Sequence, residues 1–85
     1  MSYIPTAVIP AQFGESFRRE RTQRKLTQAE LAEKAGVTRQ TILQIEKGEN
    51  VGLHVIMRAL AALNMGLRID TARINYDNVE ALFDE

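Results

Sequence analysis

The sequence contains no cysteine, no tryptophan and a single histidine, His54. Without cysteine the chain can form neither disulfides nor thiolate zinc sites, and one histidine cannot build a multi-histidine metal site within one chain. No apolar run approaches the ~20 residues that cross a bilayer, and no secretory hydrophobic region follows the first methionine. We therefore expect a cytoplasmic protein with no membrane contact, no metal and no cofactor.

The formal net charge of the chain is zero, but the positive and negative residues are unevenly distributed along it. Residues 1–76 hold all 11 lysines and arginines but only seven of the 11 acidic residues, and residues 77–85 carry the other four. A basic body followed by an acidic tail is typical of a binding domain with an interaction tail. A solvated tail without a partner is an equally good interpretation.

Proline is scarce, and both prolines lie near the amino end. Pro5 and Pro10 exclude a helix interior, so we interpret residues 1–11 as an arm. From residue 12, Phe13 and Phe17 lie one turn apart on the same side, which predicts a first helix to about residue 25.

Two short segments follow, each of which opens on a threonine and closes on a glycine. Thr27 can cap a helix, with Glu30 completing a capping box and Gly36 ending it. Thr38 and Gly48 bound the next helix in the same way. Such short helices are marginal alone in water, and two of them joined by a glycine turn indicate a helix-turn-helix. The expected core residues are Leu31, Ala32, Ala35, Val37, Ile42 and Ile45.

The expected fourth helix, residues 53–63, is apolar on two faces. One face suits the core and comprises Leu53, Ile56, Leu60 and Leu63. The other comprises Val55, Ala59 and Ala62. A helix that is apolar on two faces is covered on both, and we expect a second copy of the chain to cover the second face.

Residues 65–76 alternate as a strand does, with Leu67, Ile69 and Thr71 on one side. A strand needs a partner for its backbone groups, and either the same strand of a second copy or the amino-terminal arm could supply it. We favour the dimer, which would place Leu67 and Ile69 in its interface. Residues 77–85 form the acidic tail, where Asp77 and Glu80 have capping-box spacing that predicts one helical turn.

The run "LTQAELAEKAGVTRQTILQIEKGE", residues 26–49, resembles the helix-turn-helix family of the Xre, Cro and C1 repressors, with the match extending back to Arg21 and forward through "ALAAL". The resemblance implies a mostly α, four-helix, lambda-repressor-like domain over residues 12–64. Phage repressors usually continue into a fifth helix, whereas this chain continues into the expected strand. That arrangement looks like the HipB-type antitoxins, whose carboxyl-terminal strands pair across a dimer.

By resemblance, the third helix should enter the major groove of double-stranded DNA. Arg39, Gln40 and Gln44 stand where the similar repressors carry base-reading residues; arginine can bridge two guanine atoms and glutamine two adenine atoms. Thr38 stands at the start of this helix. Leu43 could contact a thymine methyl or pack as a half-buried residue. Without the resemblance, these positions would read as the polar stripe of any amphipathic helix.

The family also places phosphate contacts at Thr27 and Gln28, where a helix amino end offers free N–H groups to an anion. Lys47 follows the third helix and is a further candidate, as is Lys25, which stands where the family often carries glycine. By the same resemblance, Arg21 and Glu46 form a structural ion pair. The rest of "RRERTQR" is expected to be a solvated helix face, with Arg18 or Arg24 as candidates at the DNA backbone.

These observations predict a sequence-specific DNA-binding regulator rather than an enzyme, because no catalytic constellation is present. We expect an autorepressor that binds an inverted repeat as a homodimer. The HipB resemblance implies an antitoxin that also binds a kinase-like toxin. The alternative is a protein-interaction module that binds a partner protein through the helix-turn-helix surface, arm or acidic tail, with little DNA binding.

Overall fold

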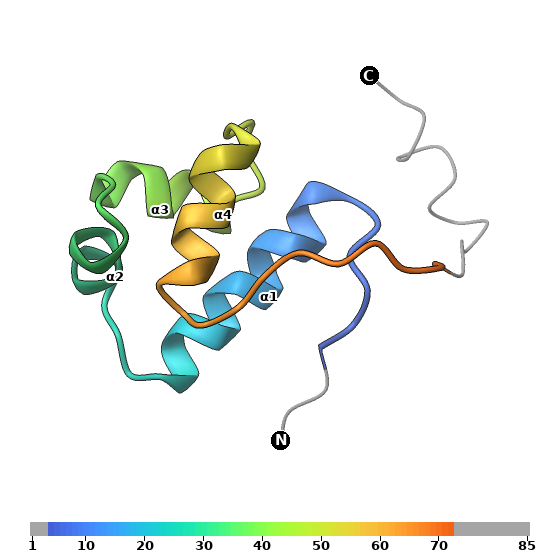
Figure 1. Ribbon diagram of the computed structural model, residues 1–85, viewed down its shortest axis with the longest axis horizontal. Coiled ribbons are helices and arrows are strands. Elements are labelled where there is room, and N and C mark those ends of the chain that lie inside the picture. Colours follow the sequence, from blue (N-terminus) through green and yellow to red (C-terminus); the bar gives the residue numbers. More distant parts are fainter. Residues whose placement is uncertain (1–3, 73–85) are drawn as a thin grey trace.

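The computed structural model describes residues 4–72, which form a domain of four helices. The helices are α1 (Pro10–Gln23), α2 (Gln28–Ala35), α3 (Arg39–Glu46) and α4 (Leu53–Ala61). In Figure 1, α2 and α3 form one end of the molecule, residues 4–9 lie towards the other end, and residues 65–72 run past α1 towards that other end. The predicted four-helix, mostly α architecture is confirmed.

Helix α1 begins two residues earlier than predicted, at Pro10. Proline is favoured at the first helical position because its missing N–H would have no partner within the helix. The Gln12 Oε1 atom reaches back and accepts hydrogen bonds from the N–H groups of Val8 (2.7 Å) and Ile9 (3.3 Å). These bonds satisfy backbone donors at the junction between the arm and α1.

The predicted caps of α2 and α3 are confirmed. The Thr27 Oγ1 accepts from the Glu30 N–H at 3.0 Å, and the Glu30 carboxylate accepts from the Thr27 N–H at 2.8 Å. This backbone hydrogen bond lowers the pKa of the Glu30 carboxyl because it stabilises the ionised form. Gly36 then ends α2 with φ at 71°, and Thr38 caps α3 by accepting from the Thr41 N–H at 3.1 Å.

Replacing Thr27 by alanine should lower the free energy of unfolding by about 1 kcal/mol, because the Glu30 N–H loses its acceptor. Thr27→Ser keeps the hydroxyl and should retain most of the stability. Urea denaturation followed by circular dichroism measures both. Equal losses in the two variants would contradict a capping role for the hydroxyl.

The core joins one face from every helix. Leu31, Ala32, Ala35, Ile42 and Ile45 are buried as predicted, and Val37 packs against them. α1 adds Phe17, while the α4 region adds Ala59, Leu60 and Leu63.

The prediction was wrong for two residues of α4. Leu53 is 59% exposed. Side chains in a helix tilt towards its amino end, and Leu53 is the first residue of α4, so no preceding turn of the helix covers its side chain. Ala59 is completely buried within a single chain, so it has no surface for the second copy that we expected to cover it. Ala62 also packs partly against this core, whereas Val55 remains partly exposed.

A close contact between α1 and α3 depends on Gly14, which the sequence reading overlooked. A Cβ atom at this position would lie 2.6 Å from the carbonyl oxygens of both Ile45 and Glu46. Because these are backbone atoms, a side chain at Gly14 would push the two helices apart.

Gly14→Ala should therefore lower the free energy of unfolding by about 2 kcal/mol, the usual range for forced overpacking, despite the better helix propensity of alanine. Chemical denaturation measures the loss. Gly66→Ala is a matched control, since no heavy atom lies within 4 Å of its added Cβ, and it should leave stability nearly unchanged. Similar values for both variants would show that the helices separate without strain.

Residues 65–72 form neither a helix nor a strand in the single chain. Among the described residues, no backbone hydrogen bond joins them to residues 4–9, the rival partner for the predicted strand. A strand is defined by its partner's hydrogen bonds, so pairing across a dimer stays a prediction. Residues 73–76 of that strand and the acidic tail, including its predicted helical turn, lie outside the described residues. Within residues 4–72, every helix is too short or too polar to cross a membrane.

Candidate DNA-binding surface

Helix α3 turns a polar face away from the core. Ile42 and Ile45 are buried on its inner side, whereas Arg39 and Gln40 are exposed and Gln44 is partly exposed on the outer side. Gln40 and Gln44 are four residues apart, so their side chains lie on the same side of the helix. No hydrogen bond or ion pair holds these three polar side chains to another described residue. They are available to bind another molecule.

Thr38 and Leu43, the other two predicted base contacts, differ in how they interact with the rest of the domain. The Thr38 Oγ1 accepts the capping bond from Thr41 and lies 2.9 Å from the Thr41 hydroxyl. Leu43 is partly exposed and is not among the residues that pack against the core. Its side chain therefore presents exposed apolar surface next to Gln44, as a contact with a thymine methyl group would require.

The amino end of α2 lies beside the loop from α1 and carries two of the predicted phosphate contacts. Thr27 is exposed, but its hydroxyl oxygen accepts the capping bond. The Gln28 side chain is half-buried and donates through Nε2 to the Glu46 Oε1 at 3.1 Å. Lys25 and Lys47, the two predicted lysines, are both exposed.

Arg21 and Glu46 form the ion pair that the resemblance implied. The Arg21 Nε donates to the Glu46 Oε2 at 2.6 Å, and its Nη2 donates to Oε1 at 3.2 Å. The Arg21 Nη1 donates to the Leu26 carbonyl at 2.7 Å. The two side chains are only 10% and 4% exposed. With Gln28 as a further donor to Glu46, this network joins the end of α3 to α1, the following loop and α2.

The "RRERTQR" segment is less solvated than predicted. Glu20 and Arg21 are both buried. The Arg24 Nη1 donates to the Glu20 carboxylate at 2.8 Å and to the Glu20 carbonyl at 2.9 Å. Arg24 is thus already paired, whereas Arg18 is exposed. Sequence spacing hinted at the pair, because Glu20 and Arg24 are four residues apart, but it did not indicate the burial.

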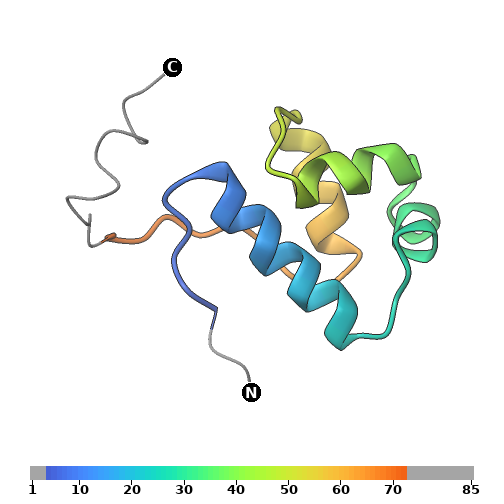
Figure 2. The same ribbon diagram turned by 180° about the vertical axis from the view of Figure 1, so that it is seen from behind.

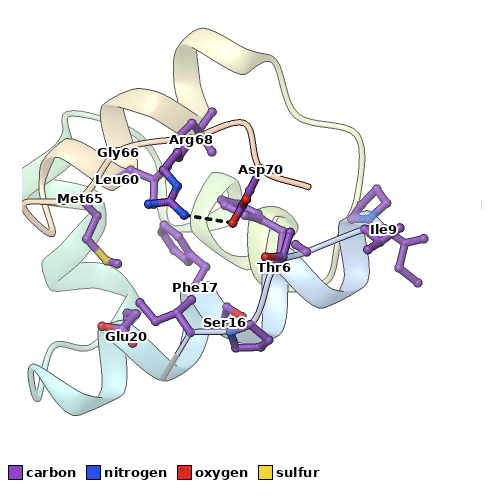
Figure 3. Close-up of a pocket in the computed structure, with 17 residues that line it drawn as sticks. Thr6, Ile9, Ser16, Phe17, Glu20, Leu60, Met65, Gly66, Arg68 and Asp70 are labelled. Atoms are coloured by element: carbon purple, nitrogen blue, oxygen red, sulfur yellow. Dashed lines mark hydrogen bonds and ion pairs between the residues drawn. The ribbon is translucent and has the colours of Figure 1, made fainter. Parts of the chain in front are cut away.

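A groove lies on another part of the molecule, between the arm, α1 and residues 65–70 (Figure 3). Its volume is about 690 Å³, and Phe17, Leu60 and Met65 are among its apolar lining residues. At its edge the Arg68 guanidinium donates to the Asp70 carboxylate at 3.0 Å and lowers the pKa of that carboxyl. No group of three histidine, aspartate or glutamate side chains in residues 4–72 could hold a metal ion.

This geometry defines a class of protein: two short capped helices meet at a glycine turn, and the second presents a free polar face. The sequence profile of the helix-turn-helix family matches residues 17–69, and the chain belongs to this family, in its Xre/Cro/C1 type. Figure 2 shows the same arrangement from behind, with α3 at the edge of the domain.

Proteins similar in sequence or structure to this chain belong to the same class. Over 47 residues the chain is 51% identical to an uncharacterised HTH-type transcriptional regulator of Methanothermobacter thermautotrophicus, an alignment that covers 51% of this chain and 68% of that protein. The restriction-modification controller protein C.AhdI of Aeromonas hydrophila is 34% identical, with a TM-score of 0.61 over 65% of this chain and 81% of that one. HipB in a complex with an O4 20mer is 28% identical, with a TM-score of 0.73 over 80% of this chain and 97% of that one. The protein is a helix-turn-helix DNA-binding transcriptional regulator.

Proposed function

We propose that the protein is a dimeric, sequence-specific autorepressor that binds an inverted repeat upstream of its own reading frame. The observation that carries this proposal is the outer face of α3, where Arg39, Gln40 and Gln44 have no partner among the described residues. Arginine and glutamine are the side chains that form bidentate hydrogen bonds with guanine and adenine in the major groove. The capped α2 and the Arg21–Glu46 network hold this helix in place.

Uncovered apolar side chains support a dimer. Leu67 is 47% exposed and Ile69 is fully exposed, on a segment whose backbone has no strand partner among residues 4–72. Pairing of this segment across a twofold axis would satisfy its backbone groups and bring both side chains into contact with neighbours on the partner strand. A twofold dimer places its two recognition helices about one helical turn apart, so the half-sites should be spaced by ~10 base pairs.

The likeness to HipB supports a further part of the proposal, a role as the antitoxin of a toxin–antitoxin pair. In a HipA–HipB–O2–O3 complex, a similar chain is 26% identical, with a TM-score of 0.69 over 86% of this chain and all of that one. This coverage extends well beyond the helix-turn-helix residues. Co-purification with the protein encoded by the adjacent reading frame, with and without residues 73–85, tests this part separately.

Fluorescence anisotropy tests the central proposal. The wild type should bind a duplex from upstream of its reading frame roughly a thousandfold more tightly than a scrambled duplex of equal composition. Measurements at two salt concentrations separate base recognition from phosphate binding, because the phosphate contribution falls with salt. If the two duplexes bind equally and an unbiased DNA selection yields no consensus, sequence-specific binding is refuted. The protein-interaction alternative would then account better for the chain.

A further inference from the structure

All four helices end in the same hydrogen-bond pattern, the Schellman motif, in which the chain passes through a left-handed residue. After α1 the Lys25 N–H donates to the Thr22 carbonyl at 3.0 Å, and the Leu26 N–H donates to the Arg21 carbonyl at 3.3 Å. The corresponding left-handed residues after α2, α3 and α4 are Gly36, Gly48 and Asn64.

Lys25 is the exception among these four residues. Its φ of 58° matches the 57° of Asn64 and approaches the 71° and 73° of the two glycines. Glycine adopts this conformation without steric cost and asparagine tolerates it, whereas the Cβ of a lysine clashes with its own backbone. A lysine at this position therefore lowers the stability of the fold relative to glycine.

The two backbone hydrogen bonds of the motif would form equally with glycine at this position, and no contact of the lysine side chain with another described residue offsets the added cost. Lys25 is exposed, and its amine makes no hydrogen bond or ion pair with another residue among 4–72. The neighbouring cations differ, because Arg21 is paired with Glu46 and Arg24 with Glu20. Lys25 is thus the one unpaired cation of residues 21–25, two residues before the threonine that caps α2.

We infer that Lys25 is retained in this strained conformation because its ammonium group binds a phosphate of the DNA backbone. This inference rests on the proposed DNA-binding function and deepens it. Lys25 in the turn after α1 thus lowers the stability of the fold and raises the affinity for DNA. A phosphate contact carries no sequence information, so Lys25 strengthens binding to the operator and to other DNA alike.

Lys25→Gly tests both halves of the inference in the full-length protein. The unfolding equilibrium constant should fall roughly fivefold, because glycine relieves the left-handed strain, partly offset by its greater freedom when unfolded. Affinity should fall roughly tenfold at low salt, for upstream and scrambled duplexes equally, and the salt dependence should become shallower by about 1 per protomer. Lys25→Arg keeps a positive charge and the strain, and should bind DNA nearly as the wild type does.

Asn64→Gly is the matched control for the backbone change, since it places a glycine in the same left-handed conformation at the end of α4 and should leave DNA affinity and salt dependence unchanged. An unchanged salt dependence in Lys25→Gly would overturn the phosphate contact, and unchanged stability would overturn the strain. Failure of the proposed function gives a different result. The wild type would then bind both duplexes equally, and the salt dependence on the scrambled duplex would still report on Lys25.

Discussion

Replacing Arg39, Gln40 and Gln44 together by alanine should abolish the preference for operator DNA, a loss of roughly a thousandfold in operator affinity. Each bidentate contact to a base contributes about 1–3 kcal/mol of discrimination, so three of them account for most of the ~4–10 kcal/mol that separates specific from nonspecific binding. Affinity for scrambled DNA should fall far less, because only one of the three side chains is charged. Anisotropy titrations of both duplexes measure the two effects.

The fold should survive this change. The three side chains form no bond with another described residue, and alanine is the best helix former, so the free energy of unfolding should stay the same or rise slightly. Lys34→Ala is a suitable control, since it also removes one exposed positive charge but lies on α2. Retained operator preference in the triple variant would place base recognition elsewhere than on the outer face of α3.

Glu46→Ala should lower the free energy of unfolding by about 3–5 kcal/mol, the expected cost of leaving a buried charge without its partner. Arg21 would lose both hydrogen bonds to the carboxylate, and the Gln28 amide would lose its acceptor. Domains of this size are stable by only about 5–15 kcal/mol, so much of the protein could be unfolded at physiological temperature. Urea denaturation and thermal melting measure the change.

The double variant Arg21→Met/Glu46→Met keeps this prediction testable even when the single variant does not fold. Apolar residues of similar volume remove both charges at once, so the double variant should be clearly more stable than Glu46→Ala. A loss below about 1 kcal/mol in Glu46→Ala would mean that water screens the pair as it does a surface salt bridge. Because Glu46 is the last residue of α3, the single variant should also lose operator affinity through a less well-held helix.

The starts and ends of α2 and α3 could be predicted from the sequence because they are marked by residues with strong local preferences. Thr27 with Glu30, and Thr38, mark helix starts through hydrogen bonds that reach only three residues along the chain. Gly36 marks a helix end through its own backbone freedom. The 3.6-residue period then separated buried Ile42 and Ile45 from the polar outer face of α3. Only the resemblance to the Xre, Cro and C1 repressors marked that polar face as a candidate base-reading surface.

Features that depend on the distance between helices could be found only in the packed fold. Gly14 has no sequence signal, and only the crossing of α1 over the end of α3 makes its missing side chain necessary. Periodicity assigned Ala59 to a dimer face, but a small residue is also what a close-packed core admits, and the core covers it. The sequence pattern indicates that Glu20 is a surface charge, whereas the packed structure buries it in an ion pair with Arg24. The helices and their caps could be predicted from the sequence alone, because they depend on hydrogen bonds between residues close together in the chain. Burial and close approach arise only when helices pack against one another, so they became apparent only in the folded structure.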